Sequence, residues 1–331
     1  MQKISREQLI EKATELMNNG TVSAVFGWQK GEFDYDITPA LFESEAELKE
    51  NFVWNDFCGA NFSKYLVNRT KKIEGKVLVF LKSCDTYSFN QLLTEHRFDR
   101  EKVYAVGIPC DGMVDIEKIK EECPDAISSI DTTGEKVAVN TIYGDKKEIA
   151  KETVLAERCA NCKSKKHVAY DELMGDEGEI LDSNRFDEVA RLEAMTPDER
   201  FAFWQNELSR CIRCNACRDV CPACTCEKCV FTNPDSGVEN KAAANSFEEK
   251  MFHIIRAFHV AGRCTDCGEC SRVCPQNIPL HLLNRKFIKD INEFYGDYQA
   301  GAEVGLRAPL VDYTTDDIEP GEALDGRDID A

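Results

Sequence analysis

Two cysteine runs that repeat one another constrain this chain more than any other feature of its sequence. The first run, C-I-R-C-N-A-C-R-D-V-C-P, spans residues 211–222, and a second run with the same cysteine spacing begins 53 residues later, at Cys264. The proline after the fourth cysteine and the arginine before the first keep the same offset. C-x2-C-x2-C-x3-C-P is a spacing that binds 4Fe–4S clusters. The repeat therefore predicts a pair of such clusters.

Each run is expected to supply ligands to both clusters. Three cysteines at short spacing wrap one face of a cuboidal cluster, whereas the fourth lies too far around and ligates the other cluster. The alternative is a pair of zinc knuckles, which need C-x2-C pairs but neither the third cysteine nor the proline. We assign Cys211, Cys214, Cys217 and Cys274 to cluster one, and Cys264, Cys267, Cys270 and Cys221 to cluster two.

Composition indicates the compartment in which these cysteines would remain reduced. The chain has 17 cysteines and a formal net charge of −19. Residues 1–16 form an amphipathic pattern rather than a signal peptide, and no apolar run approaches the roughly 18 residues of a membrane span. We therefore expect a cytoplasmic protein whose reduced thiols bind metal rather than form disulfides. The negative charge argues against nucleic acid as a partner.

Apolar residues at helical spacing surround both runs. Thr196–Glu199 reads as a capping box with proline at the first helical position, so a helix should begin there. We expect a mainly helical domain in which the apolar stripes pack in a core, with part of the aromatic surface covered by another subunit. His253 and His259 are expected to be packing or surface residues. The predicted stripes contain Phe201, Trp204 and Leu208, then Phe247, Met251, Ile254, Ile255 and Phe258, and finally Leu282, Leu283, Phe287, Ile291 and Phe294.

The first half of the chain predicts an α/β domain. A capping box at Ser5–Gln8 begins a helix that ends near Gly20, and a short strand should follow at residues 22–26. Apolar runs at 76–81 and 103–108 read as buried strands with a helix at about 86–96 between them. Strand, helix and strand at this spacing form a βαβ unit, so the sheet should be partly parallel.

Cysteines follow both of these predicted strands. Cys84 and Cys110 each precede an aspartate, and the carboxyl ends of parallel strands are where open α/β sheets place their sites. Cys159 and Cys162 form a later C-x2-C beside Lys163, Lys165, Lys166 and His167. These four thiolates could complete a third 4Fe–4S site. The alternative is two buried structural cysteines and an unrelated zinc half-site.

Three further cysteines follow Cys221 closely. Cys224, Cys226 and Cys229 could form a fourth cluster or a zinc site if Cys58, or else Cys123, completed it. The alternative is that they are free thiols in a tight loop.

These motifs resemble a known family. Residues 211–229 (CIRCNACRDVCPACTCEKC) and 264–282 (CTDCGECSRVCPQNIPLHL) are similar to the beta subunits of deazaflavin-linked formate dehydrogenases of methanogens. The first half resembles the flavin domain that those subunits share with matching hydrogenase beta subunits. That similarity rests on Pro109-Cys110-Asp111, Cys84-Asp85 and the C-x2-C motif. The resemblance spans about residues 20–310 and implies a third cluster at Cys84, Cys110, Cys159 and Cys162 beside a flavin.

Two departures from the family count against FAD. Met17-Asn-Asn-Gly-Thr21 replaces the paired glycines of the family, and the segment after the C-x2-C motif runs quickly from Met174 into a helix at 185–194. No dinucleotide glycine fingerprint is present in the sequence. The family resemblance therefore implies bound FAD, but these residues do not support it. FAD binding is left open.

The sequence predicts four parts and one principal function. The parts are an α/β domain (1–157), a connector with the C-x2-C motif (158–195), a helical ferredoxin domain with two 4Fe–4S clusters (196–298) and an acidic tail (299–331). We expect an iron–sulfur subunit that relays single electrons between partner subunits of an anaerobic redox complex. The alternative is a flavin-containing catalytic subunit that exchanges electrons with a deazaflavin or NAD(P) hydride carrier. No small-molecule substrate is assigned.

Overall fold

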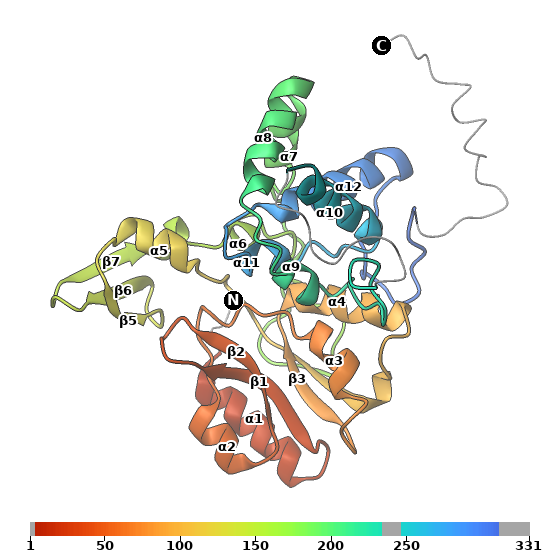
Figure 1. Cartoon of the computed structure of the whole chain (residues 1–331). Coiled ribbons are helices and arrows are strands. Elements are labelled where there is room, and N and C mark those ends of the chain that lie inside the picture. The colour runs from red at the N-terminus through yellow and green to blue at the C-terminus, as the bar shows by residue number, and fades with distance from the viewer. Residues whose placement is uncertain (1–3, 234–245, 311–331) are drawn as a thin grey trace.

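The computed structural model describes residues 4–233 and 246–310, and its first half is built on a five-stranded sheet (Figure 1). β1, β3, β4 and β8 are parallel neighbours, and β2 pairs antiparallel with β1. The predicted partly parallel sheet is confirmed, although the sequence pattern does not predict β2 or β8. In order across the sheet, the strands are β2 (Ile37–Phe42), β1 (Ala24–Lys30), β3 (Val77–Leu81), β4 (Val103–Gly107) and β8 (Glu172–Leu173).

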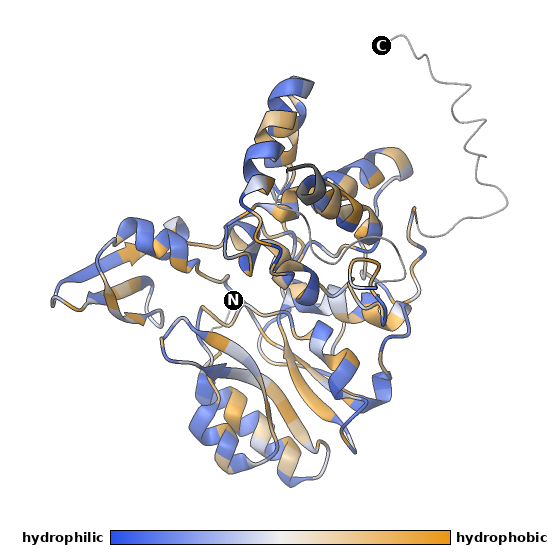
Figure 2. Ribbon diagram, viewed as in Figure 1, coloured by the Kyte–Doolittle hydropathy of each residue, from blue (hydrophilic) through white to orange (hydrophobic). Residues whose placement is uncertain are grey.

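Four helices pack with this sheet and bury its core. They are α1 (Arg6–Asn18), α2 (Glu45–Asn51), α3 (Ser63–Arg69) and α4 (Ser83–Thr94). Every residue of β3 is buried, and Figure 2 colours this strand as hydrophobic. A strand that is apolar along its whole length is typical of a parallel sheet covered on both faces. The predicted capping box of α1 is confirmed, since the Ser5 and Gln8 side chains each accept from the other residue's backbone N–H.

A second, smaller sheet that the sequence pattern does not predict extends to one side of the first (Figure 1). Its antiparallel strands are β5 (Ile127–Asp131), β6 (Lys136–Thr141) and β7 (Lys146–Ala150). A small apolar core joins it to α5 (Ile116–Glu122). Single 3-10 turns lie before β4 and after β7, at Arg100–Lys102 and Lys151–Thr153.

The described part of the second half contains helices joined by loops. α10 packs against α8 and α12, and Figure 1 shows these three long helices grouped together. The predicted capping box at Thr196 and Glu199 begins α8. The helices are α6 (Glu157–Ala160), α7 (Asp187–Glu193), α8 (Pro197–Ser209), α9 (Ala216–Asp219), α10 (Ser246–Val260), α11 (Glu269–Arg272) and α12 (Leu280–Tyr295).

The predicted buried face of α10 is wrong. Met251, Ile254 and Phe258 are exposed, and Phe258 is 62% exposed. The reason is that α10 turns another face to the first cysteine run, where Arg256 donates a hydrogen bond to the backbone oxygen of Cys217 (2.8 Å). On the neighbouring helices, Phe201 and Phe294 are also exposed rather than buried. The side chains of α10 that the structure buries are Phe252, His253, Arg256, Ala257 and Val260.

Candidate metal centres

The two cysteine runs fold in the same way. In the first run Arg213 and Asn215 have φ angles of 54° and 62°, and in the second run Asp266 and Gly268 have φ angles of 58° and 67°. These matched left-handed residues turn the backbone sharply between successive cysteines. A short helix follows each loop, α9 in the first run and α11 in the second. The repeat in the sequence is therefore also a repeat in backbone conformation.

A first-run cavity lies between the loop of the first run and α10. Cys221, which follows α9, is not among the residues that line it. The fourth thiol comes from the second run instead. Phe252 and His253 of α10 also line the cavity. Four thiols around one cavity form the donor set that a 4Fe–4S cluster requires. These thiols belong to Cys211, Cys214, Cys217 and Cys274.

The charge of Cys221 acts on all three closely spaced thiols of the second run. Burial is the main cause of the raised pKa values of Cys264 and Cys267, and the charge of Cys221 raises them further. Burial also raises the pKa of Cys270 to about 12, again with a contribution from Cys221. Such charge effects act over a few ångströms. We refer to Cys221 and these three cysteines as the second-run group. Thiols with raised pKa values must release protons when they bind metal.

Positive charge beside the thiols comes from a buried arginine that sequence reasoning missed. Burial alone would lower the pKa of Arg256, but the thiols of Cys221 and Cys270 raise it. A fixed cation near the sulfurs is one of the means by which proteins tune cluster potentials. The arginines within and directly before the two runs have other contacts. Arg210, Arg263 and Arg272 form ion pairs with Glu207, Glu95 and Glu269, and Arg213 lies over the Phe252 ring.

An N-terminal cavity brings the four scattered cysteines of the first half together. Cys84 lies in the first turn of α4 after β3, Cys110 follows β4, and Cys159 and Cys162 lie in and just after α6. All four line this cavity. A backbone hydrogen bond from Ile108 to Leu81 (2.9 Å) holds the two strand ends side by side. Burial raises the pKa of Cys110 to about 11.

The basic residues that follow the C-x2-C motif differ in their positions. Lys163 and Lys165 line the N-terminal cavity, and Lys165 donates to the backbone oxygen of Cys110 (2.8 Å). Lys166 points to solvent near Glu177. His167 is buried, and its Nε2 lies 3.2 Å from the Leu81 oxygen and 3.0 Å from the Ile108 oxygen. His167 therefore fastens the strand ends that carry the cysteines.

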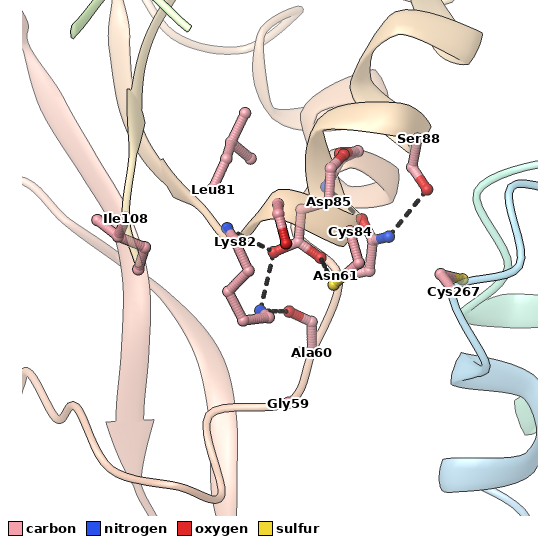
Figure 3. A network of polar contacts seen from close by, with 12 residues as sticks. Gly59, Ala60, Asn61, Leu81, Lys82, Cys84, Asp85, Ser88, Ile108 and Cys267 are labelled. Atoms are coloured by element: carbon pink, nitrogen blue, oxygen red, sulfur yellow. Dashed lines mark hydrogen bonds and ion pairs between the residues drawn. The ribbon is translucent and has the colours of Figure 1, made fainter. Parts of the chain in front are cut away.

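A buried polar network supports Cys84 (Figure 3). Lys82 and Asp85 are almost completely buried, with Nζ 2.8 Å from the carboxylate, and Nζ also donates to the Ala60 oxygen (3.0 Å). Burial acts to lower the pKa of Lys82, but Asp85 and the nearby thiols raise it, so Lys82 stays charged. Figure 3 shows Cys267 of the second run across from Cys84.

Arg158 and Glu269 connect the N-terminal cavity to the second run. Arg158 donates to the backbone oxygens of Cys267 and Gly59, each at 2.9 Å, and pairs with Glu269. Glu269 is fully buried and also pairs with Arg272 (2.6 Å). Cys267 itself lines the N-terminal cavity. This cavity and the second-run group are therefore direct neighbours.

The remaining cysteines are spread over separate places. Cys58 is buried in the main core, where its sulfur contacts Val53 and Asn55, and Cys123 is buried in the core of the small sheet. Burial raises the pKa of Cys58 to about 12. These contacts give no support to either residue as the fourth ligand of an extra site. Cys224, Cys226 and Cys229 follow Cys221 in a loop, and Cys226 is exposed.

Among the described residues, no group of three or more histidine, cysteine or acidic side chains is arranged to hold a single metal ion. Sequence reasoning missed His253, Arg256, Arg158 and Glu269 as site residues. The buried face of α10 could have been found from the sequence. Phe252, Arg256 and Val260 also recur at helical spacing, and this stripe contains a positively charged residue.

Comparison with known proteins agrees with this site. A family model described as a 4Fe-4S dicluster domain matches residues 207–278. The chain therefore has a 4Fe–4S dicluster domain that includes both cysteine runs. Among the described residues, no helix combines the length and the apolar character that a membrane crossing demands.

Two curated relatives extend the similarity to most of the chain. The F420-dependent formate dehydrogenase subunit beta of Methanocaldococcus jannaschii is 22% identical, over 88% of this chain and 90% of its own length. The F420-dependent formate dehydrogenase 1 subunit beta of Methanococcus maripaludis is also 22% identical, over 89% and 92%. A structure of the F420-reducing [NiFe] hydrogenase complex from Methanosarcina barkeri matches at 12% identity and a TM-score of 0.37, over 62% of this chain and 86% of its own. The predicted resemblance to the beta subunits is confirmed.

Proposed function

We propose, from this relationship to the beta subunits of F420-dependent formate dehydrogenases, that the chain is an iron–sulfur electron-transfer subunit of a larger anaerobic redox complex in the cytoplasm. It relays single electrons between partner subunits of formate dehydrogenase, hydrogenase or heterodisulfide-reductase type. Substrate chemistry takes place elsewhere in the complex. The observation that supports this most is the N-terminal cavity, because cysteines from both halves of the chain line it.

The four predicted parts serve this function as follows. The α/β domain (1–157) and the connector (158–195) carry Cys84, Cys110, Cys159 and Cys162 as ligands of a third cluster. The mainly helical domain (196–298) holds cluster one in the first-run cavity and cluster two in the second-run group. The acidic tail (299–331) contacts a partner subunit through the segment from Asp312 onward, which lies outside the described residues. Cys224, Cys226 and Cys229 form a loop without an assigned metal.

The chain's own residues prepare these sites for one-electron chemistry, which 4Fe–4S clusters supply when bound. Lys82 and Arg158 bring positive charge to the N-terminal cavity, and Arg256 brings it to the two ferredoxin sites. Each cation favours the more negative, reduced state of a neighbouring site. Cys217 and Cys270 are buried, and the low polarity around buried thiols strengthens these electrostatic effects.

The alternative function is that of a flavin-containing catalytic subunit. The relatives are named F420-dependent, and F420 is a deazaflavin hydride carrier. One surface feature favours this alternative. An open cleft lined by Lys71, Lys72 and Lys102, with the half-exposed ring of Tyr170, offers positive charge and an aromatic face. These are groups that a flavin nucleotide could use.

Anaerobic purification from the native cells, with iron, sulfide and flavin quantification, separates the two functions. We expect about twelve irons per chain, four for each of three cubanes, co-purification with redox subunits, and FAD that is absent or well below one per chain. Stoichiometric FAD would favour the catalytic alternative. Recovery as a lone monomer, even at low salt, would contradict the relay function.

Replacing Cys110 with serine tests the third cluster in the full chain. We expect the variant to lose about four irons while the spectra of clusters one and two persist, because Cys110 lines only the N-terminal cavity among those described. Cys123→Ser is a matched control, since Cys123 is also a cysteine of the first half but lies in the core of the small sheet and does not line this cavity. Unchanged iron content in Cys110→Ser would disprove a cluster in the N-terminal cavity.

A further inference from the structure

His253 is a buried histidine of α10 whose ring has no hydrogen-bond partner among the described residues. Its side chain is 2% exposed and lines the first-run cavity together with the four cysteines. Both ring nitrogens, Nδ1 and Nε2, are buried and unpaired within the part of the chain that the structure describes. Buried polar groups are almost always paired in folded proteins, so each exception needs an explanation. The natural place for a partner is inside the cavity that the ring lines.

The surroundings of His253 keep its ring neutral. Burial, followed by the positive charges of Arg256 and Arg213, lowers the pKa of His253 to about 3. A neutral imidazole has one N–H donor and one acceptor nitrogen. The Phe252 ring contacts it edge-on, with ring centroids 4.9 Å apart, so this neighbour offers packing rather than a polar partner.

The second run already contains the kind of contact that would pair this donor. Asn284 of α12 is buried, and its side-chain amide donates to the sulfur of Cys270 (3.7 Å). A buried N–H from a long helix therefore reaches a cysteine sulfur in one run. At the first run, His253 is a buried donor that lines the first-run cavity.

We propose that the ring N–H of His253 donates a hydrogen bond to a sulfur atom of a 4Fe–4S cluster in the first-run cavity. This rests on the proposed function, because it takes the cavity to hold cluster one. The four cysteines complete the thiolate set, so His253 acts as a positioning residue and not as an iron ligand. A hydrogen bond to sulfur stabilises the reduced state, which carries one more negative charge. His253 therefore makes cluster one easier to reduce.

The test compares His253→Phe, His253→Gln and the unchanged full chain, all purified anaerobically. His259→Phe is the matched control, because His259 lies on the same helix with an exposed side chain. The paramagnetic resonance signal of cluster one is identified by its loss in Cys214→Ser. At the midpoint potential of the unchanged chain, we expect the reduced-to-oxidised ratio of cluster one to fall about tenfold in His253→Phe, the effect of one hydrogen bond to a charged acceptor. His253→Gln, which retains an N–H donor, should show a smaller fall in this ratio.

A second measurement does not depend on whether the variants fold. In the unchanged chain grown with 15N-histidine, pulsed paramagnetic resonance of reduced cluster one should detect a weak 15N coupling. The absence of a 15N coupling would overturn the proposal. A redox titration of cluster one in His253→Phe that matches the titration of the unchanged chain would overturn it as well. A strong coupling of the size that direct iron–nitrogen bonds give would also overturn it, in favour of ligation. Absence of the cluster one signal from the unchanged chain would instead refute the proposed function.

Discussion

Replacing Cys274 with serine should remove the cluster of the first-run cavity, although Cys274 belongs to the second run. The first-run cavity is lined by Cys274 and the three closely spaced cysteines of the first run, and Cys221 is not among its lining residues. Serine keeps the size of the side chain but is a poor ligand for iron. We expect a loss of about four irons per chain. Paramagnetic resonance should show the signal of cluster two unchanged.

The reciprocal variant gives the control for this experiment. Cys221→Ser should remove cluster two and leave cluster one, because the proposed assignment exchanges the two fourth cysteines between the runs. Spectra of Cys214→Ser and Cys267→Ser identify the two signals beforehand. If Cys274→Ser lost the cluster that Cys267→Ser loses, the crossed assignment would be wrong.

Replacing Glu269 with alanine should destabilise the chain more than any single surface change. Glu269 is fully buried between Arg158 and Arg272, and it also accepts a hydrogen bond from the backbone N–H of Asn61 (3.2 Å). Its removal leaves Arg158 as a buried cation without its carboxylate. Breaking a buried ion pair in this way costs about 3–5 kcal/mol of unfolding free energy. Anaerobic urea unfolding of the full chain at neutral pH measures the change.

Glu148 provides the matched control for this change. It pairs with Lys136 (3.0 Å) across the exposed face of β6 and β7, so Glu148→Ala should change the unfolding free energy by less than about 1 kcal/mol. Equal effects of the two substitutions would show that the buried ion pair contributes no more to the free energy of unfolding than the exposed one.

Lowering the pH should weaken the contribution of Glu269 to the free energy of unfolding. Burial acts to raise the pKa of Glu269, but Arg272 and Arg158 lower it to about 2. The unfolded value is about 4.3, so the folded pKa is the lower of the two. The stabilisation is therefore complete above roughly pH 5 and is lost as the pH falls towards 2.

Cysteine spacing predicted that Cys211, Cys214 and Cys217 come together, because ligation by the first three cysteines of such a run is a local matter. Only two residues separate each of these cysteines from the next, so backbone geometry leaves little choice. The meeting of Cys84 and Cys110 could also be predicted, since parallel strands end at the same edge of a sheet. Both arguments need only the sequence near each cysteine.

The remaining features depend on packing that short sequence windows do not record. The small sheet rests on strands of five or six residues, of which β7 buries only Ile149. On α10, apolar residues lie on two faces, and the face that became buried is the one that carries Arg256 and His253. Arg158 and Glu269 are 111 residues apart, so no local pattern joins them.

The walls of the N-terminal cavity come from both halves of the chain. Cys84 and Cys110 form one side, while Asp266, Cys267 and Arg285 form the other. Arg285 is nearly inaccessible and pairs with Glu157 and Asp266 at 2.6 and 2.8 Å, which latches the halves together. If this cavity holds a third cluster, we expect iron and sulfide to enter it before the ion pairs of Arg285 join the two halves of the chain.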